Sequence, residues 1–237
     1  MNDKKAQKIF LARSLGNFLI LSSLFFVAKT FAPPLAAEAR FFADTTILDK
    51  KYVVLETDEA SASPTEEPTF DVSKKSQLLS WPTTGTTEVI VPADPRFSIV
   101  IPKIAANSPV IQDVDASNES EYLEALRRGV AHAAGTYLPG EGGNVFLFAH
   151  STDYIWNIGA YNAVFYLLYK LEAGDEVNVF YKGRRYTYIV YDKQTVSPQE
   201  VGALIEPASE ERITLQTCWP PGTTLQRLLV FAKRKVV

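Results

Sequence analysis

The sequence predicts a mostly β protein: a closed or nearly closed β-barrel of about eight strands with one or two short helices, preceded by an N-terminal transmembrane helix. Short runs rich in β-branched and aromatic residues recur through the C-terminal part of the chain, with turn-forming residues between them. Helix signals are few in that part, and about 150 residues of short strands suit a single barrel. At the N-terminus a basic cluster precedes an apolar segment, the pattern of a membrane signal.

The apolar N-terminal segment is long enough to span a membrane if its flanks are counted. Residues 14–28 carry no charge, but this stretch is shorter than the roughly 20 residues that a spanning helix needs. Residues 9–32 suffice if Arg13 and Lys29 extend their charged ends to the two interfaces.

The expected topology is an uncleaved signal anchor. Residues 1–35 would form a cytoplasmic tip and the span, with the N-terminus in the cytoplasm and the rest of the chain outside. A signal peptide cleaved near residues 37–39 and a buried helix of a soluble protein are the alternatives.

Residues 36–87 read as a juxtamembrane segment followed by an acidic linker. Residues 56–71 contain six acidic side chains, no basic ones, and several Ser, Thr and Pro, so they bury too little apolar surface to fold alone. The apolar stretch 39–55 before them could form a short helix or strand, or lie along the membrane surface. The folded domain is expected at residues 88–237.

Six runs in this domain read as strands, with a tight hairpin between two of them. Lys182 and Gly183 occupy the hairpin turn. The runs are residues 97–104, 144–150, 176–181, 185–192, 212–218 and 227–234.

Two helices are indicated. The first covers residues 118–128. Asn118 can cap its N-terminus, Glu121 occupies the capping-box position, and Gly129 follows its last residue at the C′ position. A second short helix is plausible around residues 163–171.

Composition excludes several functions. The 24 basic and 27 acidic residues give a net charge of −3, which provides no general attraction to nucleic acid. The single cysteine, Cys218, and the two histidines, His132 and His150, cannot assemble a Cys/His zinc cluster within one chain, and an intramolecular disulfide is impossible.

Three chemically capable side chains lie at the ends of strand-like runs. Cys218 ends one run, and residues 219–222 (WPPG) must leave regular pairing because proline lacks an N–H donor. A cysteine nucleophile needs a base or cation, which His150 can supply, and Arg227 can stabilise an oxyanion. Singly, each has an ordinary structural interpretation, as a buried thiol, a structural imidazole or a solvated charge. Their common placement at strand ends of an exported domain favours nucleophilic catalysis.

These segments resemble a known family. The strings TLQTC (214–218) and NVFLFAH (144–150), with Arg227 in LQRLLVFAKR, are similar to the three motif regions of the sortases, membrane-anchored cysteine transpeptidases. The resemblance covers essentially all of residues 88–237. Residues 101–104 are similar to the family's early strand, and residues 129–144 are similar to the segment that leads to its histidine. Residues 171–190 are similar to its middle hairpin.

The resemblance implies a mechanism and a substrate class. Cys218 would be the nucleophile, His150 its acid/base partner and Arg227 the oxyanion stabiliser, whereas His132 would be structural or line the substrate site. The substrate would be a surface protein with a C-terminal sorting signal similar to Leu-Pro-x-Thr-Gly. The acyl group would pass through a thioester to an amine of the cell envelope or a pilin. A hydrolase on the same fold, and an exported peptide-binding or scaffolding barrel without catalysis, remain alternatives.

No cofactor is expected. Some sortases use calcium, and Asp192, Glu200 and Glu206 precede the cysteine strand, but calcium needs six or more converging oxygens. Solvated loop carboxylates are the preferred interpretation. No carboxylate clearly orients His150, although Asp153 is close in sequence.

Overall fold

The computed structural model describes residues 3–54, 87–151, 163–200 and 210–235 of the 237-residue chain. It separates into two compact units, Met1–Arg40 and Phe41–Val237, which we describe individually.

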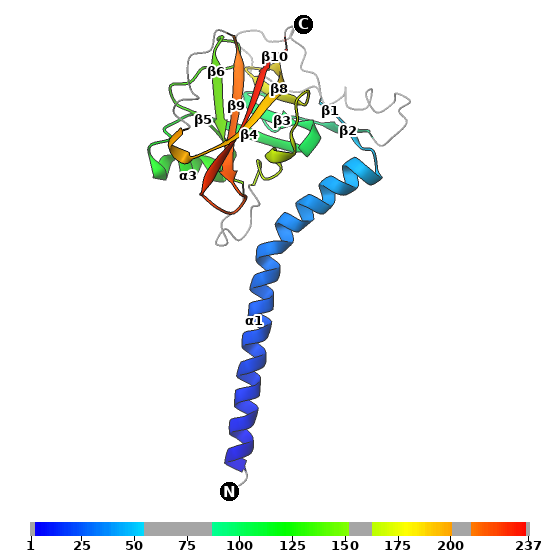
Figure 1. Ribbon diagram of the computed structural model, residues 1–237, viewed down its shortest axis with the longest axis vertical. Helices are drawn as coiled ribbons and strands as arrows, with labels where there is room; N and C mark the ends of the chain where they lie inside the picture. Colours follow the sequence, from blue (N-terminus) through cyan, green and yellow to red (C-terminus); the bar gives the residue numbers. More distant parts are fainter. Residues whose placement is uncertain (1–2, 55–86, 152–162, 201–209, 236–237) are drawn as a thin grey trace. The chain divides into compact units, whose positions relative to one another are not determined.

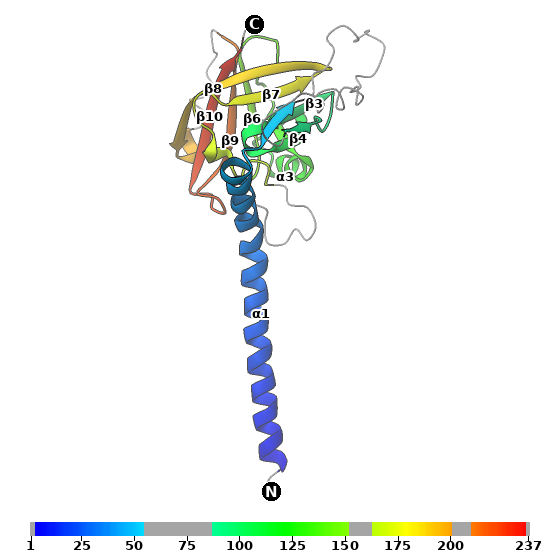
Figure 2. The ribbon, with the colours of Figure 1, turned by 90° about the vertical axis from the view of Figure 1, so that its right-hand side faces the viewer.

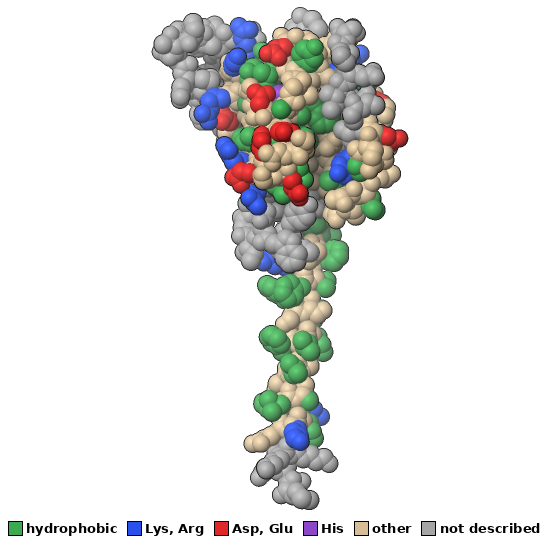
Figure 3. All heavy atoms as spheres, turned by 90° about the vertical axis from the view of Figure 1, so that its left-hand side faces the viewer, with side chains coloured by type: hydrophobic (Ala, Val, Ile, Leu, Met, Phe, Trp, Pro, Cys, Tyr) green, Lys and Arg blue, Asp and Glu red, His purple; other side chains and the backbone are tan. Residues whose placement is uncertain are grey.

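The first unit is helical. Helix α1 extends over Asp3–Phe42, and its segment Gln7–Ala32 is long and apolar enough to cross a membrane, with a mean hydropathy of 1.7. Large apolar side chains are exposed along this segment (Figure 3). Phe18, Leu21 and Phe25 are among them. A signal sequence has the same length and composition, so this helix is compatible with an anchor and with a cleaved signal.

The second unit contains a closed eight-stranded barrel, which confirms the predicted fold class (Figures 1 and 2). The strands follow one another around it in the order β10-β8-β7-β3-β4-β5-β6-β9. Two neighbouring pairs are parallel, β4 with β5 and β6 with β9. The strands are β3 (Phe97–Ile101), β4 (Ala106–Val114), β5 (Val130–Ala133), β6 (Asn144–Phe148), β7 (Glu176–Tyr181), β8 (Arg184–Val196), β9 (Arg212–Trp219) and β10 (Gln226–Arg234).

The barrel interior holds the main core. Successive side chains of a strand point to opposite faces, and on β9 the fully buried Ile213 and Leu215 belong to the core cluster. Their partners on β10, Ala232 and Val230, belong to it as well. The alternate positions of β9 and β10 therefore lie on the outer face.

Two barrel strands are absent from the six predicted runs. The first half of β4 contains Asn107-Ser108-Pro109, residue types that are rare in strands. Strand β5 has only four residues, VAHA. Helix α3 (Glu119–Arg128) connects the two and makes their parallel pairing possible. Tertiary pairing rather than local propensity places these strands.

Helix α3 confirms the first predicted helix, with different chemistry at both ends. Asn118 Oδ1 accepts a hydrogen bond from Glu121 N at 3.4 Å. The Glu121 carboxylate does not accept from the backbone N–H of Asn118, as a capping box requires, but accepts from Asp115 N at 3.0 Å and from Asn118 Nδ2 at 3.5 Å. Gly129 has an extended backbone, with φ 162°, rather than the left-handed conformation of a C′ glycine. Glycine is needed there because a Cβ would collide with the carbonyl oxygen of Pro109.

The second predicted helix is only a short 3₁₀ turn. Within residues 163–171, the structure has turns and the 3₁₀ helix η3 (Leu168–Lys170). By contrast, the predicted hairpin is confirmed: Lys182 and Gly183, with φ of 50° and 76°, join β7 to β8.

The apolar stretch before the acidic linker pairs with the barrel unit. It forms the π-helical turn η1 (Ala43–Ile47) and strand β1 (Lys51–Val54), which pairs in parallel with β2 (Thr87–Ile90). Val54 is buried against Val100 and Phe180. The compact unit thus begins at residue 41, and the predicted linker 56–71 lies outside the described residues.

Candidate active site

The candidate site begins where β6 and β9 end side by side. These parallel strands are in register at Phe148 and Gln216. The ladder continues one residue further, because Ala149 N donates to Gln216 O at 3.1 Å. The buried hydroxyl of Thr217 donates to Ala149 O at 2.9 Å. The two strand ends are therefore held together just before His150 and Cys218.

The register brings the three predicted residues to one end and one face of the barrel. His150 and Cys218 each follow the pair Phe148–Gln216 by two residues, so they point to the same outer face. Arg227 is the direct partner of Cys218 in the antiparallel pair β9–β10. Opposite residues of such a pair have neighbouring side chains on the same face.

The three side chains differ in their surroundings. All are partly exposed. Arg227 Nη1 donates to the carbonyl oxygens of Thr224 and Gln226, each at 3.1 Å, which holds the guanidinium at the start of β10. The backbone oxygen of His150 accepts from Phe165 N at 3.4 Å. The site thus combines a thiol with a fixed cation opposite and an imidazole just beyond the end of the neighbouring strand β6.

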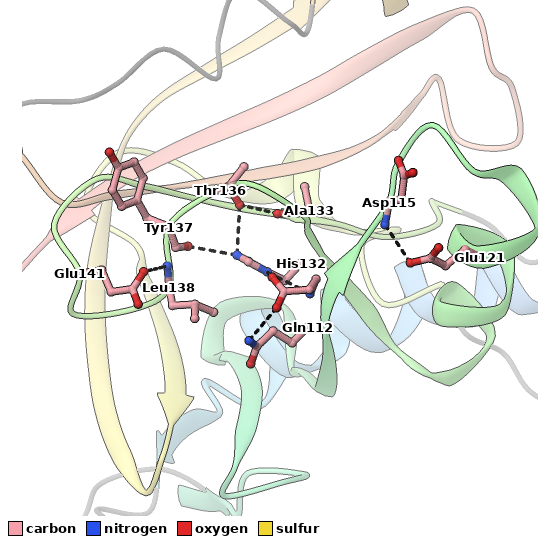
Figure 4. A network of polar contacts seen from close by, with 10 residues as sticks. Gln112, Asp115, Glu121, His132, Ala133, Thr136, Tyr137, Leu138 and Glu141 are labelled. Atoms are coloured by element: carbon pink, nitrogen blue, oxygen red, sulfur yellow. Dashed lines mark hydrogen bonds and ion pairs between the residues drawn. The ribbon is translucent and has the colours of Figure 1, made fainter.

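His132 lies on β5 and is fully buried. Figure 4 shows its ring beside Thr136 and Tyr137. It pairs with Leu147 on β6, three residues before His150 in the sequence. Its Nδ1 accepts from Asp113 N at 3.3 Å, and its Nε2 lies 3.1 Å from both Tyr137 O and Thr136 Oγ1. Burial of the ring lowers the pKa of His132. Its contacts agree with the structural interpretation.

The carboxylates considered for calcium have local partners where they are described. Asp192 accepts from Lys193 N and from Gln194 Nε2, at 2.8 and 2.7 Å. Glu200 accepts from Ser197 N at 2.8 Å. In the part of the chain that the structure describes, no three His, Cys, Asp or Glu residues form a possible metal site. The expectation that no cofactor is needed stays a prediction.

Glu206, considered above for calcium, and Asp153, considered as a partner of His150, lie outside the described residues.

The structure also gives the threonines around the cysteine a role that sequence reasoning missed. Thr217 joins β9 to the end of β6, as described above, and the buried Thr214 Oγ1 donates to Asn144 Oδ1 at 2.9 Å. Both bonds connect strands that are about 70 residues apart in sequence, with separations of 68 and 70. In the sequence, the only signal for these two hydrogen bonds is the presence of Thr214 and Thr217 within the strand-like run 212–218.

Comparison with known proteins shows the family of the domain. Residues 99–235 match the family model of the sortase domain. Sortase D of Bacillus subtilis (strain 168) is 26% identical over 137 residues, which are 56% of this chain and 61% of that protein. This chain thus spans about three-fifths of its curated relative.

Similar solved structures carry the same family name. A lid mutant of sortase A from Corynebacterium diphtheriae is 27% identical and covers 60% of this chain and 70% of its own, with a TM-score of 0.49. Clostridium perfringens sortase C, solved with the C-terminal cell wall sorting motif, is 26% identical and covers 59% and 70%, with a TM-score of 0.47. Because the family model matches more than half of the residues, this chain belongs to the sortase family.

Proposed function

We propose that this protein is a cysteine transpeptidase that cleaves a C-terminal sorting signal similar to Leu-Pro-x-Thr-Gly and joins the acyl part to an amine of the cell envelope or a pilin. Sortases are transpeptidases, and membership of that family supports the proposal. The observation that carries it is the register, which pairs Cys218 with Arg227 and ends β6 beside β9 just before His150.

The first half-reaction forms a thioester. Cys218 Sγ, as the thiolate, attacks the carbonyl carbon of the threonine-like residue. The developing oxyanion receives hydrogen bonds from the Arg227 guanidinium. Protonated His150 gives its proton to the leaving amine as the C–N bond breaks. The acyl group is then bonded to Cys218 Sγ.

The second half-reaction reverses these roles. An acceptor amine passes a proton to His150 and attacks the thioester carbonyl, and Cys218 leaves as the thiolate. A new amide bond results. If water attacks instead, the same intermediate is hydrolysed, so the acceptor decides between transfer and hydrolysis.

The location that fits this chemistry is the outer side of a membrane. We propose that α1 anchors the chain as a single span, with the basic N-terminal residues in the cytoplasm. The apolar segment Gln7–Ala32 supports this arrangement. The barrel would then meet sorting-signal-bearing proteins as they emerge.

The proposal is tested by trapping the acyl-enzyme. The full-length protein in detergent, incubated with a library of sorting-signal peptides, is expected to gain the mass of an acyl group on Cys218, and Cys218→Ala is expected to gain none. Added amines should then yield transfer products, whereas release of the free acid alone would indicate a hydrolase. Absence of any adduct across the library would contradict the mechanism.

The variant Arg227→Ala tests the proposed oxyanion role in the same acylation assay. Loss of an oxyanion donor is expected to slow acylation by about 10²–10³-fold. A slowing within about threefold, roughly 0.6 kcal/mol of barrier, would remove Arg227 from that role.

A further inference from the structure

Gln216 lies on the same outer face of β9 as Cys218, two residues before it. It is in register with Phe148 on β6 and Leu229 on β10. Both neighbours are buried, with exposed fractions of 8% and 0%. The carboxamide is therefore flanked by apolar side chains on both adjacent strands, beside the reactive residue.

The side-chain oxygen of Gln216 is unusual for its surroundings. Gln216 Oε1 is buried and has no hydrogen-bond partner among the residues that the structure describes. A buried carbonyl oxygen without a donor has lost its hydrogen bonds to water without replacement. Native proteins keep few such atoms, and each one calls for an explanation. Of the five described side-chain atoms in this state, Gln216 Oε1 is the one within two residues of Cys218.

We propose that Gln216 is a substrate-binding residue: its Oε1 accepts a hydrogen bond from a backbone N–H of the bound sorting signal. This inference rests on the proposed function, since it requires a peptide carbonyl at Cys218 Sγ. Two residues of a strand cover about 7 Å, and an extended peptide covers the same distance in two residues. The donor is then the N–H of the residue that precedes the threonine-like one.

The donor belongs to the acyl part of the peptide. That part stays on the protein through both half-reactions, whereas the amine beyond the scissile bond leaves and is replaced. The strands β6, β9 and β10 offer a fixed surface around Gln216. Past Cys218, β9 ends at Trp219 and the chain turns into the connection 220–225, so the fixed strand surface lies on the Gln216 side of Cys218.

A small side-chain movement brings the acceptor to the substrate. Gln216 as a whole is only partly buried. The last torsion of a glutamine side chain has a broad energy profile, so the carboxamide rotates at little cost. A site built to hydrogen-bond a substrate N–H discriminates against an analogue that lacks it, because the protein group then stays unpaired.

The test removes first the donor N–H of the peptide and then the acceptor oxygen of Gln216. Two peptides are compared on the full-length protein, one with the normal amide and one with an ester oxygen in place of that N–H. The wild-type protein is expected to acylate the amide peptide with a kcat/KM about tenfold higher. In Gln216→Leu the preference is expected to vanish, with kcat/KM for the amide peptide reduced about tenfold.

A stability measurement separates this role from a structural one. Gln216→Leu removes an unpaired buried acceptor, so its unfolding temperature is expected to equal or exceed that of the wild type while its activity falls. Gln216→Glu keeps an acceptor oxygen and is expected to keep the preference for the amide. Gln194→Leu is the control: this exposed glutamine also pairs with Leu229, but its amide already donates to Asp192.

Each outcome bears on one proposal. Equal rates for amide and ester in the wild type would overturn the role of Gln216 without recourse to any variant. So would a Gln216→Leu protein that is active within twofold or that retains the amide preference. A wild-type protein that forms no thioester with any peptide would instead overturn the proposed function, and this inference with it.

Discussion

At the scale of single residues, His132 couples protonation to folding. Its Nδ1 accepts a hydrogen bond from Asp113 N, which requires the unprotonated nitrogen at that position. Nε2 faces Tyr137 O and Thr136 Oγ1, and Thr136 donates its own proton to Ala133 O (Figure 4). Nε2 therefore carries the hydrogen. The neutral ring satisfies this arrangement, whereas a protonated ring would direct a second N–H at the Asp113 amide.

This arrangement predicts a loss of stability in mild acid. Burial lowers the pKa of folded His132 below its ordinary 6.5, although Tyr137 O, Asp113 and Glu141 act in the opposite direction. Near pH 6 the unfolded chain thus binds more protons at this site, and stability rises with pH. Stability is expected to fall as the pH drops below about 6.5, towards the lowered pKa of the folded state.

The measurement is the unfolding temperature of the full chain between pH 7 and pH 5. His132→Gln, which cannot titrate, should show a shallower decline than the wild type. Identical curves for the wild type and His132→Gln would exclude this contribution.

At the scale of elements, the short 3₁₀ helix η3 supports the barrel near the candidate site. Phe165, Leu168 and Leu171 around it are fully buried. The ring of Tyr169 packs on that of Trp219, the residue after Cys218, with centroids 5.4 Å apart. The segment therefore buttresses the end of β9.

Lys193 of β8 holds this segment in place. Its Nζ donates to Tyr169 O at 2.5 Å and to Leu171 O at 2.8 Å. Lys193→Met keeps the aliphatic stem but removes both charged donors. Because the side chain is largely exposed, the expected loss is modest, about 1–2 kcal/mol of unfolding free energy.

Urea denaturation checks this prediction. Lys233→Met removes an exposed lysine of β10 whose side chain makes no ion pair or hydrogen bond with the described residues, and it should change the unfolding free energy by less than about 0.5 kcal/mol. Equal effects of the two substitutions would show that Lys193 does not hold η3.

At the scale of the whole molecule, the chain between the apolar helix and the acidic linker is part of the barrel unit. Val54 of β1 is buried in a cluster with Val100 and Phe180. Lys50 Nζ also pairs with Glu88 Oε2 at 2.7 Å. Residues before and after the predicted linker are thereby joined within one unit.

A pair of valines tests this connection. Val54→Ala in the full chain removes two buried methyl groups and is expected to lower the unfolding free energy by about 1.5 kcal/mol. Val53→Ala alters the adjacent residue, which is 37% exposed, and should cost much less. Equal, negligible effects in urea denaturation would show that β1 contributes no stability to the barrel.

Much of this protein could be predicted from local sequence. The apolar N-terminal segment, six of the barrel strands, the hairpin at Lys182 and helix α3 follow from composition, alternation and capping residues. These features depend on interactions between residues that are close in sequence, such as conformational propensities and hydrogen bonds from capping side chains to the nearby backbone. The motifs around Cys218, His150 and Arg227 also indicated the family, which the domain match confirms.

Contacts between distant residues decided the rest. Strands β4 and β5 have weak propensity and exist because of pairing and the α3 crossover. The predicted second helix became a 3₁₀ turn within the packing of Leu168 and its neighbours. The pairing of Cys218 with Arg227 is a register between strands. A sequence determines which side chains exist and how each strand alternates, but only the closed sheet decides which of them meet, because register depends on the whole barrel.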